Sequence, residues 1–175
     1  DDAHLLDGVP GVEQLAEALR GLDNVQSIHI ISHGDEGRLY LGTATLTVES
    51  MADEYADELQ SLRSSLRDDA DILIYGCDFA RGELGESAAR MMSYQTGADI
   101  AASDDTTGAT TKGGDWTLEY RYGEVTTKSI ISADAQEHYA ELLNVQASVG
   151  SGAVLVSSER TIYSVDLATG KATAI

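Results

Sequence analysis

The sequence has little cysteine, few basic residues and no long apolar run. Its 175 residues include one cysteine, Cys77, so the chain cannot form an internal disulfide. No hydrophobic stretch approaches the roughly 20 residues that a membrane-spanning helix needs, so we expect no membrane span. The first residues, DDAHLLDGVPG, have neither the basic region nor the apolar core of a signal peptide. The chain also lacks an initial methionine, and we therefore expect a segment of a longer protein.

The charge is strongly one-sided. Eleven basic residues stand against 30 acidic ones, giving a net charge of -19. Such a charge repels phosphate backbones, so we predict no nucleic-acid partner. Asp104, Asp105 and Asp115 could bind calcium, but their spacing matches no known calcium loop, and we predict no metal ligand and no cofactor. Acidic, cysteine-poor chains rich in Gly, Thr and Asp are common among large secreted bacterial proteins, so we predict an extracellular or cell-surface location.

Short apolar segments alternate with amphipathic ones along the first hundred residues. Apolar and β-branched runs predict strands at residues 27–32, 72–75 and 99–103, and helical periodicity predicts helices at 11–22, 47–66 and 82–97. This alternation predicts an α/β fold with a mostly parallel sheet and helices on both faces, a three-layer α/β/α sandwich. The residues HLLD (4–7) read as the end of a first strand, and residues 116–131 as a hairpin turning at Gly123.

The composition changes again near Asn144. From there the chain consists of Gly/Ser-linked strand patterns, and TIYSVDLATGKATAI (161–175) resembles one strand–turn–strand unit of a β-propeller blade. We therefore predict an α/β domain at residues 1–143. Residues 144–175 are predicted to be a linker and a short all-β tail, the start of a propeller-like β-repeat region.

Two of the predicted strands run directly into small, reactive-looking tips. IHIIS precedes His33-Gly34, and ILIY precedes Gly76-Cys77. Functional groups of parallel α/β sheets gather just beyond the carboxyl ends of the strands, and neighbouring strands lie about 4.8 Å apart. Cys77 could then act as a nucleophile and His33 as its base, with the backbone N–H groups of Gly34 and Cys77 as oxyanion donors. The alternative is that Cys77 is a small apolar core residue, which is the usual role of a lone buried cysteine.

Four blocks of sequence carry a resemblance to known families: IISHGDEGRLYLG, ILIYGCDFARGELG, TGADIAASDDTTG and GGDWTLEY. Together they resemble a bacterial domain family of uncharacterised function, which occurs toward the N-terminal part of very large, repeat-rich surface or secreted proteins. The resemblance covers about residues 5–125. The two strand tips resemble those of the caspase–gingipain–clostripain superfamily of cysteine peptidases, which implies a caspase-like fold with His33 and Cys77 as the dyad.

The resemblance also suggests a substrate-binding site. Relatives that cut after Arg or Lys place a carboxylate at the base of the first pocket, and Asp104 and Asp105 at the end of the third strand are candidates for it. The stretch SDDTTG is equally well explained as a solvated turn.

The function that these features favour is a cysteine endopeptidase that processes its own large parent protein. Tethering would make such a cut intramolecular, with a high effective concentration of the polypeptide substrate in cis. The main alternative is a catalytically inactive caspase-like module that serves adhesion or anchoring. A calcium-ordered scaffold is a third reading. His29, on the same strand as His33, is expected to be a packed strand residue or a partner that positions His33.

Overall fold

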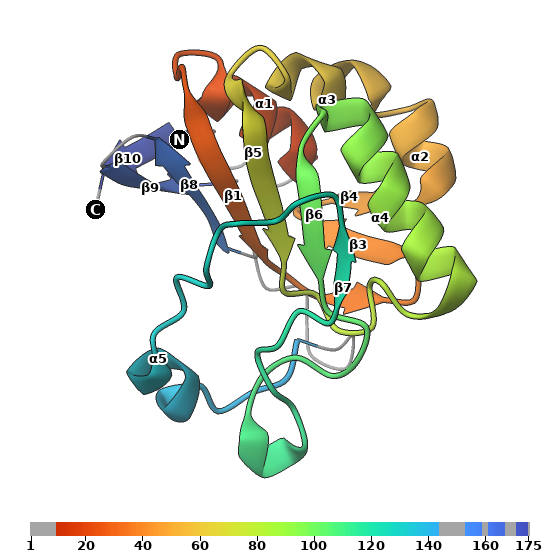
Figure 1. The fold of residues 1–175 in the computed structure, drawn as a ribbon, viewed down its shortest axis with the longest axis vertical. Coiled ribbons are helices and arrows are strands. Elements are labelled where there is room, and N and C mark those ends of the chain that lie inside the picture. Colours follow the sequence, from red (N-terminus) through yellow and green to blue (C-terminus); the bar gives the residue numbers. More distant parts are fainter. Residues whose placement is uncertain (1–9, 144–152, 159–160, 167–170, 175) are drawn as a thin grey trace, which may run out of the picture.

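The structure is a computed structural model that describes residues 10–143, 153–158, 161–166 and 171–174 (Figure 1). Within these residues the main sheet has seven strands in the order β10-β9-β8-β1-β5-β6-β7, and β2, β3 and β4 form a small second sheet. The strands are β1 (Val25–Ile31), β2 (Gly34–Asp35), β3 (Arg38–Leu41), β4 (Ala44–Leu46), β5 (Leu66–Ile74), β6 (Asp99–Ala102), β7 (Tyr120–Tyr122), β8 (Ala153–Ser158), β9 (Thr161–Asp166) and β10 (Lys171–Ala174).

The helices follow the periodicity of the sequence, with one difference. They are α1 (Gly11–Leu19), α2 (Val48–Ala52), α3 (Ala56–Leu62), α4 (Gly82–Thr96), α5 (Ala133–His138) and a 3₁₀ turn at Thr110–Lys112. Thr47 begins α2 through a capping box with Ser50, and Gly97 ends α4 in the left-handed conformation. The single helix expected at 47–66 is interrupted where Asp53 leaves helical geometry, with ψ -79°.

The predicted parallel core is present. Strands β1, β5 and β6 are parallel, and their register pairs Ile28 with Ile72 and Ile72 with Ile100. Strand β7 is antiparallel to β6 and β8 is antiparallel to β1, so the sheet is mixed. The carboxyl ends of the three parallel strands therefore lie at one edge of the sheet, at the bottom of Figure 1.

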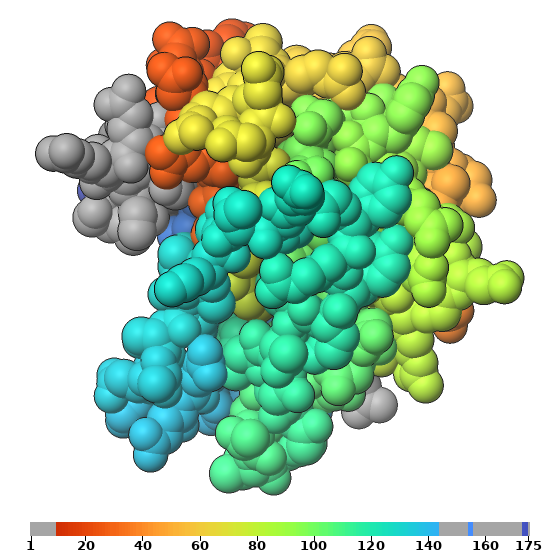
Figure 2. Space-filling model, viewed as in Figure 1, coloured from red at the N-terminus to blue at the C-terminus, as the bar shows by residue number. Residues whose placement is uncertain are grey.

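Helices cover one face of this sheet. Helices α1 to α4 share one apolar cluster with the isoleucines of β1 and β5. The opposite face is covered by Trp116, Val125, Ile131 and Tyr139, which come from the non-helical chain after β6 and from the end of α5. Figure 2 shows that chain, in blue-green, spread over this face. Among the described residues no second helical layer lies on the sheet, so the expected three-layer arrangement is not observed.

Two further expectations differ from the structure. The predicted hairpin at 116–131 has only one strand, β7, because beyond Gly123 the chain runs along the sheet face without strand pairing. The predicted separate all-β tail is also not observed: the described residues after position 152 form β8, β9 and β10, which extend the sheet of the α/β domain next to β1. The HLLD segment lies outside the described residues. None of the described helices is long and apolar enough to cross a membrane.

Candidate functional site

The two strand tips lie against each other. Gly34 follows β1 and Gly76 follows β5, and β1 and β5 are adjacent parallel strands. A side-chain carbon at Gly34 would lie 2.8 Å from the Cys77 carbonyl oxygen and 2.9 Å from the Gly76 carbonyl carbon. Only glycine fits this backbone-to-backbone approach. The fold therefore brings the His33-Gly34 and Gly76-Cys77 peptides into direct contact.

His33 is half-buried at this contact. Its backbone carbonyl accepts a hydrogen bond from the Tyr40 N–H at 3.0 Å, which joins the tip to β3 of the small sheet. Its ring atom Nδ1 is buried and has no hydrogen-bond partner among the described residues. A buried ring nitrogen without a partner is unusual, because such atoms are normally satisfied. Among the described residues no hydrogen bond joins this ring to Cys77, whose sulfur is hydrogen-bonded to Thr107 instead.

Cys77 is fully buried, with 0% of its surface exposed. Its Sγ donates to the carbonyl oxygen of Thr107 at 3.3 Å and accepts from the Thr107 N–H at 3.2 Å. Burial raises the pKa of the Cys77 thiol, the hydrogen bond from Thr107 opposes this, and the charge of Asp78 raises it further. The sulfur is therefore a neutral thiol at neutral pH, enclosed by protein.

The cover over Cys77 includes a short segment at the end of the α/β domain. Gly108 and Leu142 form an antiparallel bridge, and the Leu143 N–H donates to the Thr107 carbonyl at 3.0 Å. The Leu143 carbonyl in turn accepts from the Gly34 N–H at 3.2 Å. Leu143 is 5% exposed and packs in the same cluster as Cys77. The Gly34 N–H, predicted to be an oxyanion donor, thus binds a carbonyl of the chain itself.

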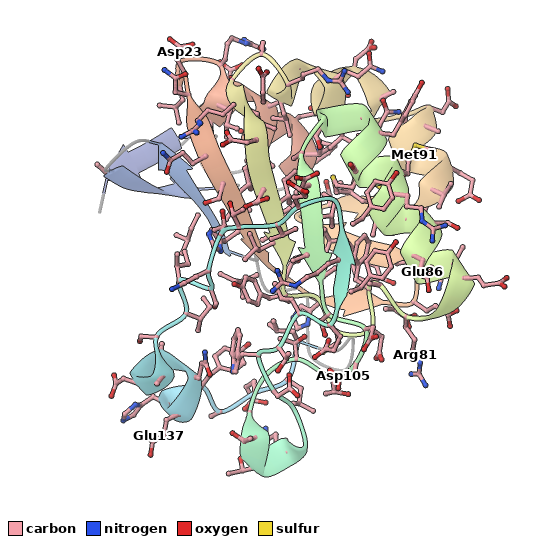
Figure 3. The ribbon with its side chains drawn as sticks, in the orientation of Figure 1. Asp23, Arg81, Glu86, Met91, Asp105 and Glu137 are labelled. Carbon is pink, nitrogen blue, oxygen red and sulfur yellow. The ribbon has the colours of Figure 1, made fainter. Side chains whose placement is uncertain are left out.

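The acidic residues near the tip point to solvent. Asp104 and Asp105 are exposed in the loop beyond β6, where Figure 3 labels Asp105. The carboxylates of Asp105, Asp115 and Glu119 lie within 4.8 Å of one another, and partial burial and these neighbours raise the pKa of Asp105. Sequence reasoning named Asp104, Asp105 and Asp115 but missed Glu119, whose carboxylate accepts from the Asp104 N–H at 3.2 Å. This cluster is the place where the described residues could hold a cation.

A second group that the sequence did not reveal lies on the helix-free face of the sheet. His29, fully buried on β1, lies beside the Tyr75 ring, whose hydroxyl donates to Ser129 Oγ at 2.9 Å. Burial lowers the pKa of His29 to about 4, while the Asp71 charge opposes the shift. His29 is therefore a packed strand residue, and its polar partners are Ser27 and Tyr75.

Asp71 forms hydrogen bonds between this face of the sheet and the chain that covers it. Its Oδ2 accepts hydrogen bonds from the backbone N–H groups of Thr126 and Thr127, at 3.0 and 2.7 Å. Next to this network lies a cavity of about 380 Å³, lined by Leu73, Trp116 and the chain at 125–129 among others. The available signal was that Asp71 directly precedes the apolar run Ile72–Ile74 and is itself buried, whereas Asp68 and Asp69 on the same strand are exposed.

Comparisons with known proteins add one finding. The model of a family described as a domain of unknown function, DUF4347, matches residues 3–143. The comparisons with curated proteins and with solved structures gave no match.

Proposed function

Since the chain belongs to the DUF4347 family, a domain of unknown function, we propose its activity from the geometry of the site: it is a cysteine endopeptidase. In this proposal Cys77 is the nucleophile and His33 the general base, on a caspase-like arrangement of strand tips. The substrate is polypeptide, and the parent chain in cis is the one we favour. The site of action is the outside of a bacterial cell, as part of a large surface or secreted protein.

One observation carries the proposal: the peptides of His33-Gly34 and Gly76-Cys77 are in backbone contact at the carboxyl edge of the sheet. In this proposal the imidazole of His33, whose Nδ1 has no hydrogen-bond partner among the described residues, would be the proton acceptor that a thiol nucleophile needs. The Gly34 N–H already holds a carbonyl oxygen, as an oxyanion donor would. Nucleophile, base and donor are the three parts that acyl transfer requires.

The electrostatics of the site define how attack would begin. Because burial raises the pKa of Cys77, a resting thiolate–imidazolium pair is not expected. The thiol proton would pass to His33 as the sulfur attacks, and His33 would return it to the leaving amine. Because the resting thiol is neutral, the proposed activity should require His33 as well as Cys77.

A second candidate function rests on a different observation. Cys77 has no exposed surface and makes two hydrogen bonds to Thr107, which is the environment of a structural cysteine. A domain with this fold and no turnover would serve as an adhesion or anchoring module. The two functions differ in whether any cut depends on Cys77.

The test compares the purified wild-type chain with Cys77→Ala and His33→Ala after incubation at mildly alkaline pH, followed by intact-mass spectrometry. His138→Ala is the matched control, because His138 is an exposed histidine on α5. We expect fragments from the wild type and from His138→Ala, and intact chains from the other two variants. Identical patterns in all four proteins, whether cut or intact, would rule out the peptidase in favour of the anchoring module.

A further inference from the structure

We infer that this chain cuts itself after Leu143, and that residues 141–143 lie in the site as its bound substrate. The inference rests on the proposed function and adds its substrate. The chain leaves α5 and returns beneath the carboxyl ends of the parallel strands (Figure 1). There the Leu143 carbonyl accepts the Gly34 N–H at 3.2 Å.

The hydrogen bonds of this segment are those of a peptide bound in extended form. The Ala109 N–H donates to the Glu141 carbonyl at 2.9 Å, and the Leu143 N–H donates to the Thr107 carbonyl at 3.0 Å. This pairing of backbone with backbone is how an enzyme holds an extended substrate by adding it as a strand. It fixes the position of the Leu143 carbonyl without using any side chain of the substrate.

The Leu143 carbonyl is the group that we assign to the attack. Its oxygen accepts the Gly34 N–H at 3.2 Å, and the Leu143 residue packs against Cys77. The Leu143 N–H also lies near enough to the sulfur to influence the pKa of the thiol. The Glu141 carbonyl is engaged elsewhere, because it accepts the Ala109 N–H.

This arrangement also accounts for the burial of Cys77. A thiol with no exposed surface cannot meet a free peptide, but it can react with a peptide that already covers it. The enclosure is then the enzyme–substrate complex before reaction. Holding both reacting groups in place replaces a bimolecular encounter by a unimolecular step.

The reaction balances with water as the only co-reactant. Cys77 Sγ bonds to the Leu143 carbonyl carbon while its proton passes to His33. The bond from that carbon to the nitrogen of Asn144 then breaks, and His33 gives the proton to the departing amine, leaving a thioester. Water adds to the thioester, which releases a Leu143 carboxylate and regenerates the thiol.

The neighbours of Leu143 indicate the substrate class. Its side chain is 5% exposed and lies in a cluster with Leu73, Tyr75 and Leu118. Asp104 and Asp105, in contrast, are exposed. The residue before the cut bond is therefore expected to be apolar, with leucine fitting and a charged side chain excluded by the cost of burying it.

The experiment maps the end of the fragment in the intact 175-residue chain. Wild type and Cys77→Ala are incubated with and without hydroxylamine, and the products are identified by mass spectrometry. Hydroxylamine attacks thioesters, so a cut through a Cys77 thioester yields a fragment that ends at Leu143 as a hydroxamate. The chain contains no Asn-Gly bond, which hydroxylamine would otherwise cleave.

We expect the wild type to give the Leu143 acid without hydroxylamine and the Leu143 hydroxamate with it, and Cys77→Ala to give neither. Leu143→Met should retain the cut and Leu143→Asp should lose it, with thermal unfolding used to check that both variants are folded. If Leu143→Asp does not fold, the position of the hydroxamate in the wild-type fragment alone shows whether the cut follows Leu143. A Cys77-dependent fragment that ends elsewhere overturns this inference and leaves the proposed function standing. No Cys77-dependent fragment overturns both.

Discussion

The two faces of the central sheet differ in chemistry and in what covers them. Alternate residues of the same strands form them: Ile28, Ile30, Ile72 and Ile74 face the helices, and His29, Leu73, Tyr75 and Cys77 belong to the other side. The first face is apolar and fully covered by helices. The second holds ionisable and hydroxyl groups beneath a non-helical chain held by a few hydrogen bonds. Segments of this second kind open at lower free energy than helix-packed cores.

The largest expected difference between the faces is in packing. Ile74→Ala, on the helix face, should lower the free energy of unfolding by about 4 kcal/mol, because truncation leaves a cavity between sheet and helices. Leu73→Ala should lower the free energy of unfolding by only about 2 kcal/mol. Leu73 already lines a cavity of about 380 Å³, so its truncation removes fewer packing contacts. Urea unfolding of the two variants measures both values. Equal costs would show that the two faces are packed equally well.

The buried imidazole on the second face should make stability depend on pH. The pKa of His29 is about 4 in the folded chain and 6.5 when solvated, so the unfolded chain binds more protons between these values. The free energy of unfolding should therefore fall by about 3 kcal/mol from His29 as the pH drops from 6.5 to 4. Denaturant unfolding at several pH values measures the slope, and His29→Gln should flatten it. An unchanged slope in that variant would contradict the burial of a neutral imidazole.

A smaller loss of stability is expected when the hydrogen bonds to Asp71 are removed. Asp71→Ala removes the acceptor of the Thr126 and Thr127 N–H groups, which should lower the free energy of unfolding by about 2 kcal/mol. Asp99 is the matched control, because it pairs with Asp71 across β5 and β6 and accepts the Glu124 N–H at a more exposed position. Asp99→Ala should cost about 0.5 kcal/mol. Amide hydrogen exchange at 124–129 should show the same order, and the reverse order would contradict it.

The smallest expected difference between the two faces is the loss of stability when a single hydroxyl is removed from each. Ser129→Ala removes the acceptor of the Tyr75 hydroxyl and should destabilise the fold by about 1 kcal/mol. Ser87→Ala removes an exposed hydroxyl on α4 that donates to the Glu83 carbonyl and should change the free energy of unfolding by less than about 0.5 kcal/mol. Thermal unfolding distinguishes the two. Equal changes in the unfolding temperature of the two variants would indicate that the hydrogen bond between Tyr75 and Ser129 does not stabilise the fold.

The sequence predicted the parallel core and the helices well, because each of these elements carries its own period of apolar residues. The isoleucine pairs of β1, β5 and β6 and the end of α4 at Gly97 are examples. It missed the break at Asp53, because the helical period of apolar residues continues across the interruption. It also misjudged the second face, because the chain beyond Gly123 has an alternating pattern that fits a paired strand and an extended cover equally well.

At the site, the sequence named His33, Gly34 and Cys77 from their positions after apolar runs. It did not predict that Thr107 and Leu143 enclose the sulfur, because their contacts join positions 30 or more residues apart, and nothing local in the sequence encodes them. Glu119 was missed because its contact with Asp104, 15 residues away, forms only when the loop after β6 folds back on the chain before β7.

The sequence by itself determined which segments become strands and helices and which small residues stand at the strand ends, since these follow from local periodicity and from the lack of a side chain at glycine. Only the tertiary structure decided what lies on each face of the sheet and over each strand end. Burial, the pKa of a thiol or an imidazole, and the partner of a backbone N–H depend on groups that the fold brings in from elsewhere in the chain.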